Sequence, residues 1–284
     1  MTDVAVVTPA YNPGPYLADA LESVISQTYS DWEAVVVDDG SAEDLSFVAQ
    51  LDSRIQLVRQ PNAGISAARN AGIAATSAPL IAFLDADDLW LPTKLEQQVA
   101  VMATSQEAGL CSTDFEIIDG DGERIRGGFD GNHGSYLDLL VTCAICVSSV
   151  MVRRDALTWL GMFDPRYSQA ADWDLWLRFA RTVPLVRSDL VLTRYRMHDT
   201  NFSRSHVQLL LTEGTEILRS HERTASEVRD AAKVGLRQLR RLVGAQEFDI
   251  FRETKHPSHL SAALRLSPRL TLSQLGRYVR ERII

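Results

Sequence analysis

The first hundred residues alternate between short apolar runs and amphipathic segments, and this alternation constrains the fold more than any other feature of the chain. The apolar runs read as strands and cover residues 4–8, 32–37, 55–58 and 80–84. Predicted helices follow each of them, at residues 16–27, 45–51, 65–75 and 94–102. Such alternation produces right-handed crossovers between parallel strands. We therefore predict an α/β fold with a doubly wound, mostly parallel central sheet flanked by helices.

The regular alternation of strands and helices ends after Gly109. Further strands are predicted at residues 110–118, 147–152 and 184–195, and a further helix at residues 173–180. The turn at residues 119–122 suggests a hairpin, and residues 123–136, rich in Gly and charge, are predicted to form a mobile loop. From His206 onward the pattern is helical, with breaks at Pro257 and Pro268. We divide the chain into a domain of residues 1–204 and a C-terminal helical region of residues 205–284.

Charge is distributed unevenly along the chain. The net charge is −8, yet residues 231–284 carry 11 Lys and Arg against 4 Asp and Glu. An acidic body without a recognisable nucleic-acid motif argues against nucleic-acid binding. No apolar run reaches the roughly 18 residues of a membrane span, and the N-terminus has no basic segment followed by an apolar one. These features predict a cytoplasmic protein.

Two of the three cysteines, Cys143 and Cys146, have a C-x-x-C spacing that suits a metal or redox site. There is no second pair, however, and the motif runs directly into the predicted strand at residues 147–152. We therefore predict buried free thiols in a reducing compartment.

An acidic cluster, Asp85-Ala86-Asp87-Asp88, follows the fourth predicted strand. The carboxyl ends of parallel strands are where open α/β sheets bind ligands. Three acids in four residues repel one another unless positive charge lies between them, and a divalent cation with a phosphate on its far side would supply it. The alternative is a solvated acidic turn in which Asp88 or Thr93 caps the next helix.

Three more loops follow predicted parallel strands and should reach the same edge of the sheet. The first, residues 8–14, lacks the G-x-G-x-x-G fingerprint, but its Tyr11 can lie against a planar base. The second holds Asp38 and Asp39, either of which can accept an N–H group from a base. Alternatively, Ser41 or Asp44 caps a short helix there.

The third loop combines Asn62, Gly64 and Ser66 with Arg69 at the start of a helix. Gly64 permits close backbone approach, and a helix N-terminus attracts anions. Alternatively, this is an Ala-rich packing helix with a solvated arginine. The convergence of four such loops on one edge predicts a nucleotide-phosphate site.

Taken together, Pro9-Ala-Tyr-Asn12, Val37-Asp-Asp-Gly-Ser41, Asn62-Ala-Gly64 and the acidic cluster resemble family 2 of the inverting glycosyltransferases with the GT-A fold, over roughly residues 1–200. The resemblance implies that Asp39 contacts the base, that Asp85 faces the ribose or the sugar, and that Asp87 holds the metal. It implies a nucleotide-sugar site formed by Pro9, Ala10, Tyr11, Asn12, Asp39, Asn62, Gly64, Arg69, Asp85 and Ala86. Residues 1–105 would then be the nucleotide-binding half and residues 106–204 the acceptor half.

The segment from Ala170 to Arg178 resembles the family's E-D-x-D-L-W-L-R motif, which makes Asp172 the implied general base. Ala171 stands where Glu is common, which weakens any role for that neighbour but leaves Asp172 intact. A base is needed because an alcohol is a poor nucleophile until its proton is taken. Asp172 also suits a helix N-cap. Trp173 and Trp176 suit either an acceptor platform or the core.

Residues 194–198, Arg-Tyr-Arg-Met-His, resemble the Y-R-x-H that closes the family's core. His198 is therefore an implied ligand of the metal or the diphosphate, although a lone histidine is often structural.

The resemblance implies a metal-dependent inverting transferase, using Mg²⁺ or Mn²⁺, that moves a sugar from a nucleotide-diphosphate sugar to a glycan or lipid-linked acceptor. A UDP-sugar is favoured, with dTDP- and GDP-sugars open. One alternative is a sugar-nucleotide pyrophosphorylase, but residues 8–14 lack the Gly-rich, Arg- or Lys-bearing loop of those enzymes. The other is a non-catalytic nucleotide-sugar-binding protein.

The basic tail places apolar residues at helical spacing, namely Leu236, Leu239, Leu242 and Val243, with Arg237, Arg240 and Arg241 at the other positions. Such helices usually pack on their own domain. The other interpretation is peripheral docking of residues 231–284 on an anionic membrane, since clustered Arg side chains are attracted to such a surface. Oligomeric state is left open by the sequence.

Overall fold

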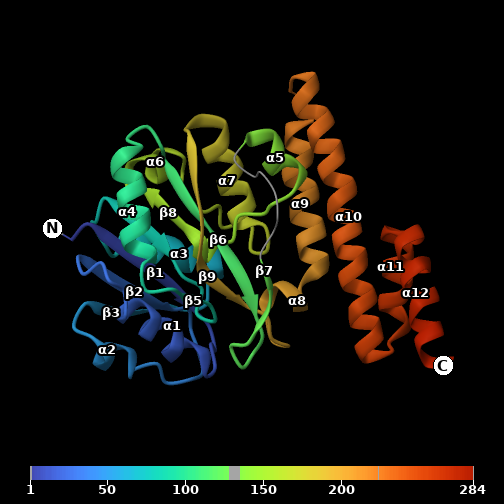
Figure 1. Ribbon diagram of the computed structural model, residues 1–284, viewed down its shortest axis with the longest axis horizontal. Helices are drawn as coiled ribbons and strands as arrows, with labels where there is room; N and C mark the ends of the chain where they lie inside the picture. Colours follow the sequence, from blue (N-terminus) through green and yellow to red (C-terminus); the bar gives the residue numbers. More distant parts are fainter. Residues whose placement is uncertain (1, 128–134, 223, 284) are drawn as a thin grey trace. The chain divides into compact units, whose positions relative to one another are not determined.

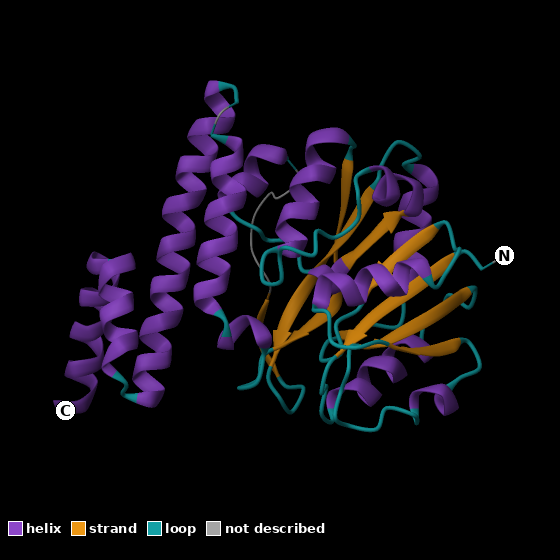
Figure 2. Ribbon diagram, turned by 180° about the vertical axis from the view of Figure 1, so that it is seen from behind, coloured by secondary structure: helices purple, strands orange, loops and turns teal. Residues whose placement is uncertain are grey.

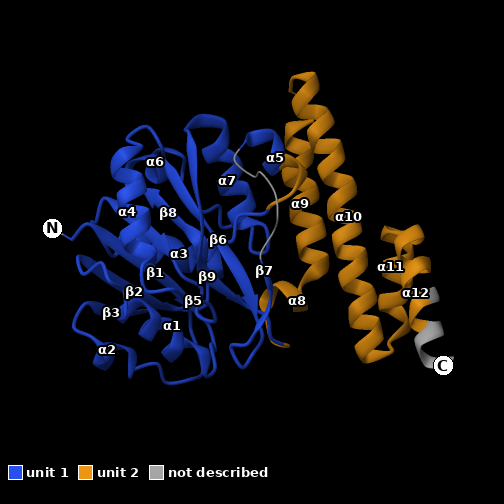
Figure 3. Cartoon of the chain, viewed as in Figure 1, with its two compact units in different colours: residues 1–139, 144–198 blue, residues 140–143, 199–284 orange. Residues whose placement is uncertain are grey.

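The computed structural model describes residues 2–127, 135–222 and 224–283. The chain divides into two compact units, one of residues 1–139 with 144–198 and the other of residues 140–143 with 199–284 (Figure 3). The domain boundaries that we place at residues 105 and 204 stay predictions.

The first unit is built on one sheet, which has nine strands among the described residues (Figure 1). The strands are β1 Val4–Ala10, β2 Trp32–Asp38, β3 Ile55–Arg59, β4 Leu80–Phe83, β5 Leu89–Trp90, β6 Leu110–Ile118, β7 Arg124–Gly127, β8 Val150–Arg153 and β9 Leu185–Arg196. Their order is β3-β2-β1-β4-β8-β6-β9-β5, and β7 pairs with β6.

Strand direction divides this sheet into two parts. Strands β3, β2, β1 and β4 run parallel, as the strand–helix alternation predicts. Strand β8 then runs antiparallel to both β4 and β6, whereas β6 and β9 are parallel. The sheet is therefore mixed, and its parallel part comes from the first hundred residues. The predicted hairpin is β6–β7. The predicted mobile loop is wrong at its ends, because residues 124–127 pair with β6 as a strand and Tyr136 begins a helix; residues 128–134 lie outside the described residues.

Helices cover the sheet, as Figure 2 shows. They are α1 Tyr16–Ile25, α2 Val48–Leu51, α3 Ile65–Ala74, α4 Lys94–Thr104, α5 Tyr136–Val141, α6 Arg154–Trp159 and α7 Ala171–Thr182, with a 3₁₀ turn η1 at Val147–Ser149. All seven residues of β1 are buried, so both faces of the sheet are covered there. The Ala- and Gly-rich α3 packs closely: a Cβ on Gly72 would lie 2.5 Å from Val7 Cγ1.

Aromatic side chains of α7 enter the core. Trp176 is fully buried among Phe83, Phe163 and Phe179. Trp173 is also buried, and its indole Nε1 donates to the Leu139 carbonyl at 2.6 Å. Burial favours the core interpretation of both tryptophans over the acceptor platform.

The second unit is helical, with α8 Phe202–Ser205, α9 Val207–His221, α10 Ser226–Thr254, α11 Pro257–Leu266 and α12 Pro268–Ile283. The two predicted proline breaks are the first residues of α11 and α12, where a missing N–H costs nothing. Leu239 and Val243 are buried, as their helical spacing suggests, but Leu242 is 47% exposed. Among the described residues there is no helix long and apolar enough to cross a membrane.

The cysteine prediction is correct in part. None of the three cysteines forms a disulfide within the described structure. Cys111 is buried, whereas Cys143 and Cys146 are half-buried, because the segment between them is a connection to η1 and not the start of a strand.

Candidate active site

The acidic turn follows β4 and sends its carboxylates in different directions. Asp85 accepts a hydrogen bond from Arg69 Nη2 at 2.7 Å. Asp87 Oδ2 lies 3.0 Å from His198 Nε2. Asp88 is fully buried. Two half-buried carboxylates therefore remain to meet a ligand, where the sequence suggests three.

Buried donors hold Asp88 inside the protein. Ser148 Oγ donates to its Oδ2 at 2.5 Å, and the Arg196 backbone N–H donates to its Oδ1 at 2.9 Å. Burial, with the negative charges of Asp87 and Asp85, raises the pKa of Asp88 well above its usual range. The repulsion inferred from the sequence is thus relieved partly by these donors and not by a cation alone.

Neither proposed cap closes helix α4. The N-cap position is Thr93, whose side chain makes no capping hydrogen bond, and the Asp88 side chain is engaged elsewhere. The capping interpretation of the acidic cluster is therefore wrong.

Asp87 and His198 form the part of the site best suited to a cation. His198 follows the end of β9, and its ring lies on Tyr16 with centroids 4.6 Å apart. A carboxylate and an imidazole side by side are suitable ligands for Mn²⁺ or Mg²⁺, which in nucleotide sites take one or two protein groups and complete their shell with phosphate oxygens and water. Within residues 2–127, 135–222 and 224–283, no group of three or more such side chains is arranged around a point.

Asp172 lies in the first turn of α7 and belongs to the same electrostatic neighbourhood as Asp85 and Arg69. Burial raises the pKa of Asp172 to about 6, the Arg69 cation opposes that rise, and the Asp85 charge adds to it. Arg69 is only 3% exposed and lies 5.2 Å from the centre of the Phe163 ring. The arginine of α3 therefore bonds to the acidic turn and lies within electrostatic range of the predicted base, and it is not the solvated arginine of the alternative interpretation.

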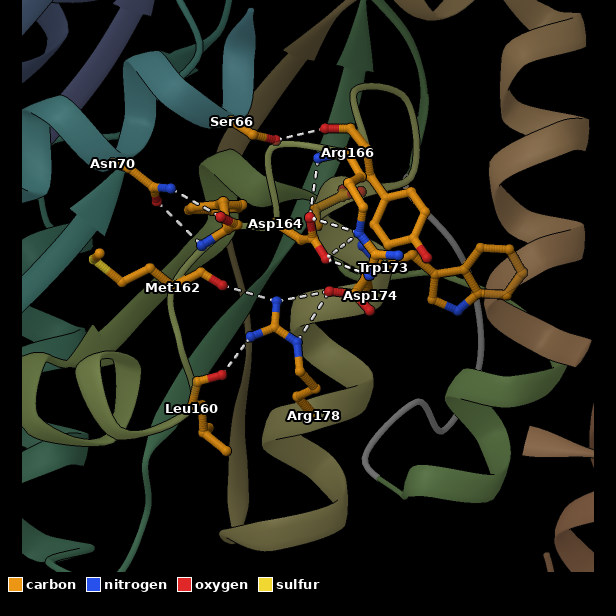
Figure 4. A network of polar contacts seen from close by, with 12 residues as sticks. Ser66, Asn70, Leu160, Met162, Asp164, Arg166, Trp173, Asp174 and Arg178 are labelled. Carbon is orange, nitrogen blue, oxygen red and sulfur yellow. Dashed lines mark hydrogen bonds and ion pairs between the residues drawn. The ribbon is translucent and has the colours of Figure 1, made fainter. Parts of the chain in front are cut away.

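Helix α3 also fixes the segment that leads into α7 (Figure 4). Ser66 Oγ donates to the Tyr167 carbonyl at 2.6 Å. The Asn70 side chain exchanges two hydrogen bonds with the backbone of Phe163, at 2.8 and 3.1 Å. Neither role shows in the sequence pattern, because these bonds join residues about a hundred positions apart.

A second set of bonds locks α7 to the same segment. Arg178 makes two hydrogen bonds to Asp174 Oδ2, at 3.0 and 2.6 Å, one turn apart on the helix. Its Nη1 donates to the Leu160 carbonyl at 2.6 Å, and Nη2, which also bonds to Asp174, donates to the Met162 carbonyl at 2.8 Å, as Figure 4 shows. The D-L-W-L-R residues of the motif are thus the framework that places Asp172. Its own Oδ1 accepts the Trp173 N–H at 2.8 Å, so it is not a conventional N-cap.

Asp39 organises the third loop. Its Oδ1 accepts from Gln60 Nε2 at 2.7 Å and from the Ala63 N–H at 2.9 Å, and its Oδ2 accepts from the Gly64 N–H at 2.9 Å. Gly40 and Gly64 have φ of 82° and 88°, the left-handed region that favours glycine. Contact between Asp39 and a base stays a prediction.

The first loop is tied to the second. Asn12 Oδ1 accepts the Ala42 N–H at 2.8 Å, and the Asn12 N–H donates to Ser41 Oγ at 2.9 Å. Ser41 therefore does not cap a helix. Asp44 does not either, since it accepts from Ser46 and the helix begins later, at Val48. The capping alternative for this loop is wrong.

The remaining predicted donor residues differ in accessibility. Pro9 and Ala10 are buried at the end of β1, so they offer backbone and not side chains. Tyr11 is 57% exposed, Asn62 is exposed, and Ala86 is half-buried. Their contact with a donor stays a prediction.

A mixed sheet with acids at the ends of its parallel strands, and a further acid on a facing helix, is the arrangement of a GT-A type transferase. Solved structures agree on the fold. S. aureus TarS in complex with UDP aligns with a TM-score of 0.65 and 15% identity, covering 95% of this chain and 82% of that one. The Pyrobaculum calidifontis mannosyltransferase PcManGT, in complex with GDP-Man and Mn²⁺, gives 0.66 and 16%, covering 99% and 80%.

The sequence comparisons give the family. The model described as Glycosyl transferase family 2 matches residues 5–158, and the chain belongs to this family of glycosyltransferases. The Escherichia coli UDP-Glc:alpha-D-GlcNAc-diphosphoundecaprenol beta-1,3-glucosyltransferase WfgD is 31% identical over 206 residues, 70% of this chain and 79% of the relative. An uncharacterized glycosyltransferase of Rickettsia bellii is 33% identical over 208 residues, but this chain matches only 30% of its length.

Proposed function

We propose that the chain is a metal-dependent inverting glycosyltransferase that moves a sugar from a nucleotide-diphosphate sugar, a UDP-sugar first among the candidates, to an acceptor hydroxyl. One observation carries the proposal. Arg69 bonds to Asp85 of the acidic turn at 2.7 Å and also opposes the raised pKa of Asp172. Arg69 thus bonds to Asp85 and acts electrostatically on Asp172, which supports a shared site for the two acids.

Asp172 would act as the general base. Its carboxylate would take the proton of the acceptor hydroxyl as the acceptor oxygen bonds to the anomeric carbon. The bond from that carbon to the donor phosphate would break, and its electron pair would leave with the nucleoside diphosphate. Attack from the face opposite the leaving group inverts the anomeric configuration.

Asp87 and His198 would hold the cation, as their contact at 3.0 Å suggests. When bound, Mg²⁺ or Mn²⁺ supplies positive charge to the diphosphate as negative charge develops on it. On the nucleotide side, the ordered loops around Asp39 and Asn12 would receive the base and ribose.

The acceptor is proposed by analogy. WfgD is named for a diphosphoundecaprenol acceptor, and the Bacillus subtilis relative TuaG for putative teichuronic acid biosynthesis. A lipid-linked saccharide or a growing surface polysaccharide is therefore the acceptor class to test first.

Thermal-shift screening of UDP-, dTDP- and GDP-sugars with Mn²⁺ tests the donor assignment, since a ligand that binds only the folded state raises Tm. We expect a Mn²⁺-dependent rise in Tm with one class of nucleotide sugar. Addition of a suitable acceptor should then release the corresponding nucleoside diphosphate. Metal-dependent binding without release across a broad acceptor panel would favour the non-catalytic alternative. Formation of the sugar nucleotide from a nucleoside triphosphate would favour the pyrophosphorylase.

The pH profile should report on Asp172. Its pKa of about 6 is that of the folded protein, and only the carboxylate accepts a proton. We therefore expect kcat/KM to rise with pH and level off above about 6, falling about tenfold per pH unit below that. The measurement is kcat/KM across pH 4.5–8 in wild type and in Asp172→Asn. The variant should keep a measurable residual rate but lose the fall in kcat/KM below pH 6. If the variant shows the same fall, the titrating group is another residue.

Peripheral membrane contact is a further part of the proposal. Arg237, Arg240 and Arg241 are exposed on α10 beside the exposed Leu242. Flotation with phosphatidylcholine vesicles that contain phosphatidylglycerol should recover the protein at low salt, and vesicles of phosphatidylcholine alone should not. Replacing Arg240 and Arg241 with Gln should weaken recovery about 30-fold, at roughly 1 kcal/mol per charge.

The charge-matched control for flotation is Arg124→Gln with Arg126→Gln, since both are exposed on β7 of the first unit. Equal recovery with both kinds of vesicle, or none at low salt, would remove the membrane interpretation and leave self-packing or oligomerisation of the helices.

A further inference from the structure

Ser148 lies beneath the acidic turn, in η1, and is fully buried. Its hydroxyl oxygen accepts the Asp85 N–H at 3.0 Å and its O–H donates to Asp88 Oδ2 at 2.5 Å. Within the described part of the chain these are the two hydrogen bonds of the hydroxyl. One small side chain therefore joins the first and last residues of the turn.

The backbone that carries Ser148 is itself fixed to the sheet. Its carbonyl accepts Trp90 Nε1 at 2.7 Å and Thr193 Oγ1 at 3.3 Å, and both donors are buried. Trp90 and Thr193 are paired residues of β5 and β9. The Ser148 hydroxyl is thus held in position by the sheet, and the acidic turn is hydrogen-bonded to it.

Arg196 holds the turn from the other side. Its Nε donates to the Asp87 carbonyl and its backbone N–H to Asp88 Oδ1, both at 2.9 Å. Its Nη1 also donates to the Gly120 carbonyl, and its guanidinium lies 4.8 Å from the centre of the Tyr16 ring. Replacement of the Arg196 side chain would remove its contacts with Asp87, Gly120 and Tyr16 together, whereas the Ser148 hydroxyl contacts the turn alone.

We propose that Ser148 is a positioning residue, whose hydroxyl sets the backbone of the acidic turn so that Asp85 and Asp87 present their carboxylates in one fixed geometry. This proposal rests on the proposed function, in which Asp87 is the cation ligand. The physical reason is that metal ligands must be held within about 0.5 Å of their working position. Partners beyond the ligands commonly change metal affinity or activity 10- to 100-fold when removed.

Ser149 provides a matched control. It is the next residue and equally buried, but its Oγ donates to the Cys146 carbonyl at 2.7 Å and not to the turn. Ser148→Ala and Ser149→Ala each remove one buried hydroxyl from η1. A general effect of loosening this segment should appear in both variants, and an effect of losing the turn's anchor only in the first.

Hydrogen exchange of the intact protein is the first measurement, because it requires no ligand. In Ser148→Ala we expect amide exchange in residues 84–90 to rise about tenfold, as the Asp85 N–H loses its acceptor. Ser149→Ala should leave those amides unchanged. Equal exchange of this segment in Ser148→Ala and wild type would overturn the proposal.

The second measurement is the Mn²⁺ concentration at which UDP binding is half-maximal (the Mn²⁺ midpoint), determined by calorimetry. We expect Ser148→Ala to raise it 10- to 100-fold and Ser149→Ala less than about twofold. Increased exchange with an unchanged midpoint would also overturn the positioning role. If wild type shows no Mn²⁺-dependent UDP binding, that result counts against the proposed donor and metal, while hydrogen exchange alone then decides whether Ser148 sets the turn.

If Ser148→Ala does not fold, Ser148→Cys replaces it in both measurements. A thiol is a weaker donor and acceptor of nearly the same size, so exchange and midpoint should lie between wild type and the full effect. Wild-type values for both in Ser148→Cys would overturn the proposal.

Discussion

Asp172→Asn is expected to lower kcat by about 10²–10⁴-fold, the usual contribution of a positioned general base. An amide has nearly the same shape as the carboxylate but cannot take a proton. Its oxygen can still accept the Trp173 N–H, which Asp172 Oδ1 accepts at 2.8 Å. Nucleotide affinity should therefore stay within about twofold of wild type. Turnover with a suitable acceptor and calorimetric binding of the nucleoside diphosphate, measured on the same preparation, check both parts.

Asp174→Asn is the matched control, since it is an acid in the same helical turn. Asp174 accepts hydrogen bonds from Nε and Nη2 of Arg178 and belongs to the framework that holds α7. Its replacement should lower Tm more than Asp172→Asn does, and any loss of turnover should follow the loss of folded protein. If nucleotide affinity in Asp172→Asn falls as much as turnover, Asp172 belongs to the donor site or to the fold, and the base must be sought elsewhere.

Asp87→Ala is expected to abolish metal-dependent donor binding and to lower turnover by at least about a hundredfold. In the proposed function its carboxylate would be a hard oxygen ligand next to His198. Metal stabilisation of developing charge contributes several kcal/mol, and each 1.4 kcal/mol equals a factor of ten. The fold should persist, since Asp87 is half-buried and its backbone carbonyl keeps the hydrogen bond from Arg196 Nε. Mn²⁺ titration of nucleotide binding is the direct measurement.

Asp189→Ala serves as the control for charge alone, because the Asp189 side chain is 95% exposed on β9. That variant should keep the wild-type Mn²⁺ midpoint. Full turnover of Asp87→Ala with unchanged metal dependence would remove Asp87 from the metal site.

The prediction of the fold was most accurate where periodicity is local. Strand β6 begins and ends at the predicted residues, Leu110 and Ile118, and both proline breaks begin helices. What periodicity did not give is the direction of β8 between β4 and β6, since a short apolar run has the same pattern in either direction. It also placed Leu242 on the buried face of a helix, although the exposed side of α10 carries it.

The candidate site divides in the same way. Motif residues at the ends of parallel strands could be selected from the sequence because topology sends those ends to one edge. Their partners could not: Asp87 meets His198 across 111 positions and Asp88 meets Ser148 across 60. Ser148 looks like an ordinary residue of an apolar segment, and only its buried contacts distinguish it from Ser149.

By itself, the sequence determined the strand–helix order, the parallel half of the sheet and the set of acids at its edge, because these follow from short-range periodicity and from the geometry of parallel crossovers. The tertiary structure decided which acids remain to meet a ligand. Asp88 is withdrawn by Ser148 and Arg196, Asp39 is occupied by the third loop, and Asp172 has its pKa raised to about 6 by burial. Burial and hydrogen bonds between distant segments set the protonation state of a carboxylate and its accessibility to a ligand. The residues next to it in the sequence determine neither.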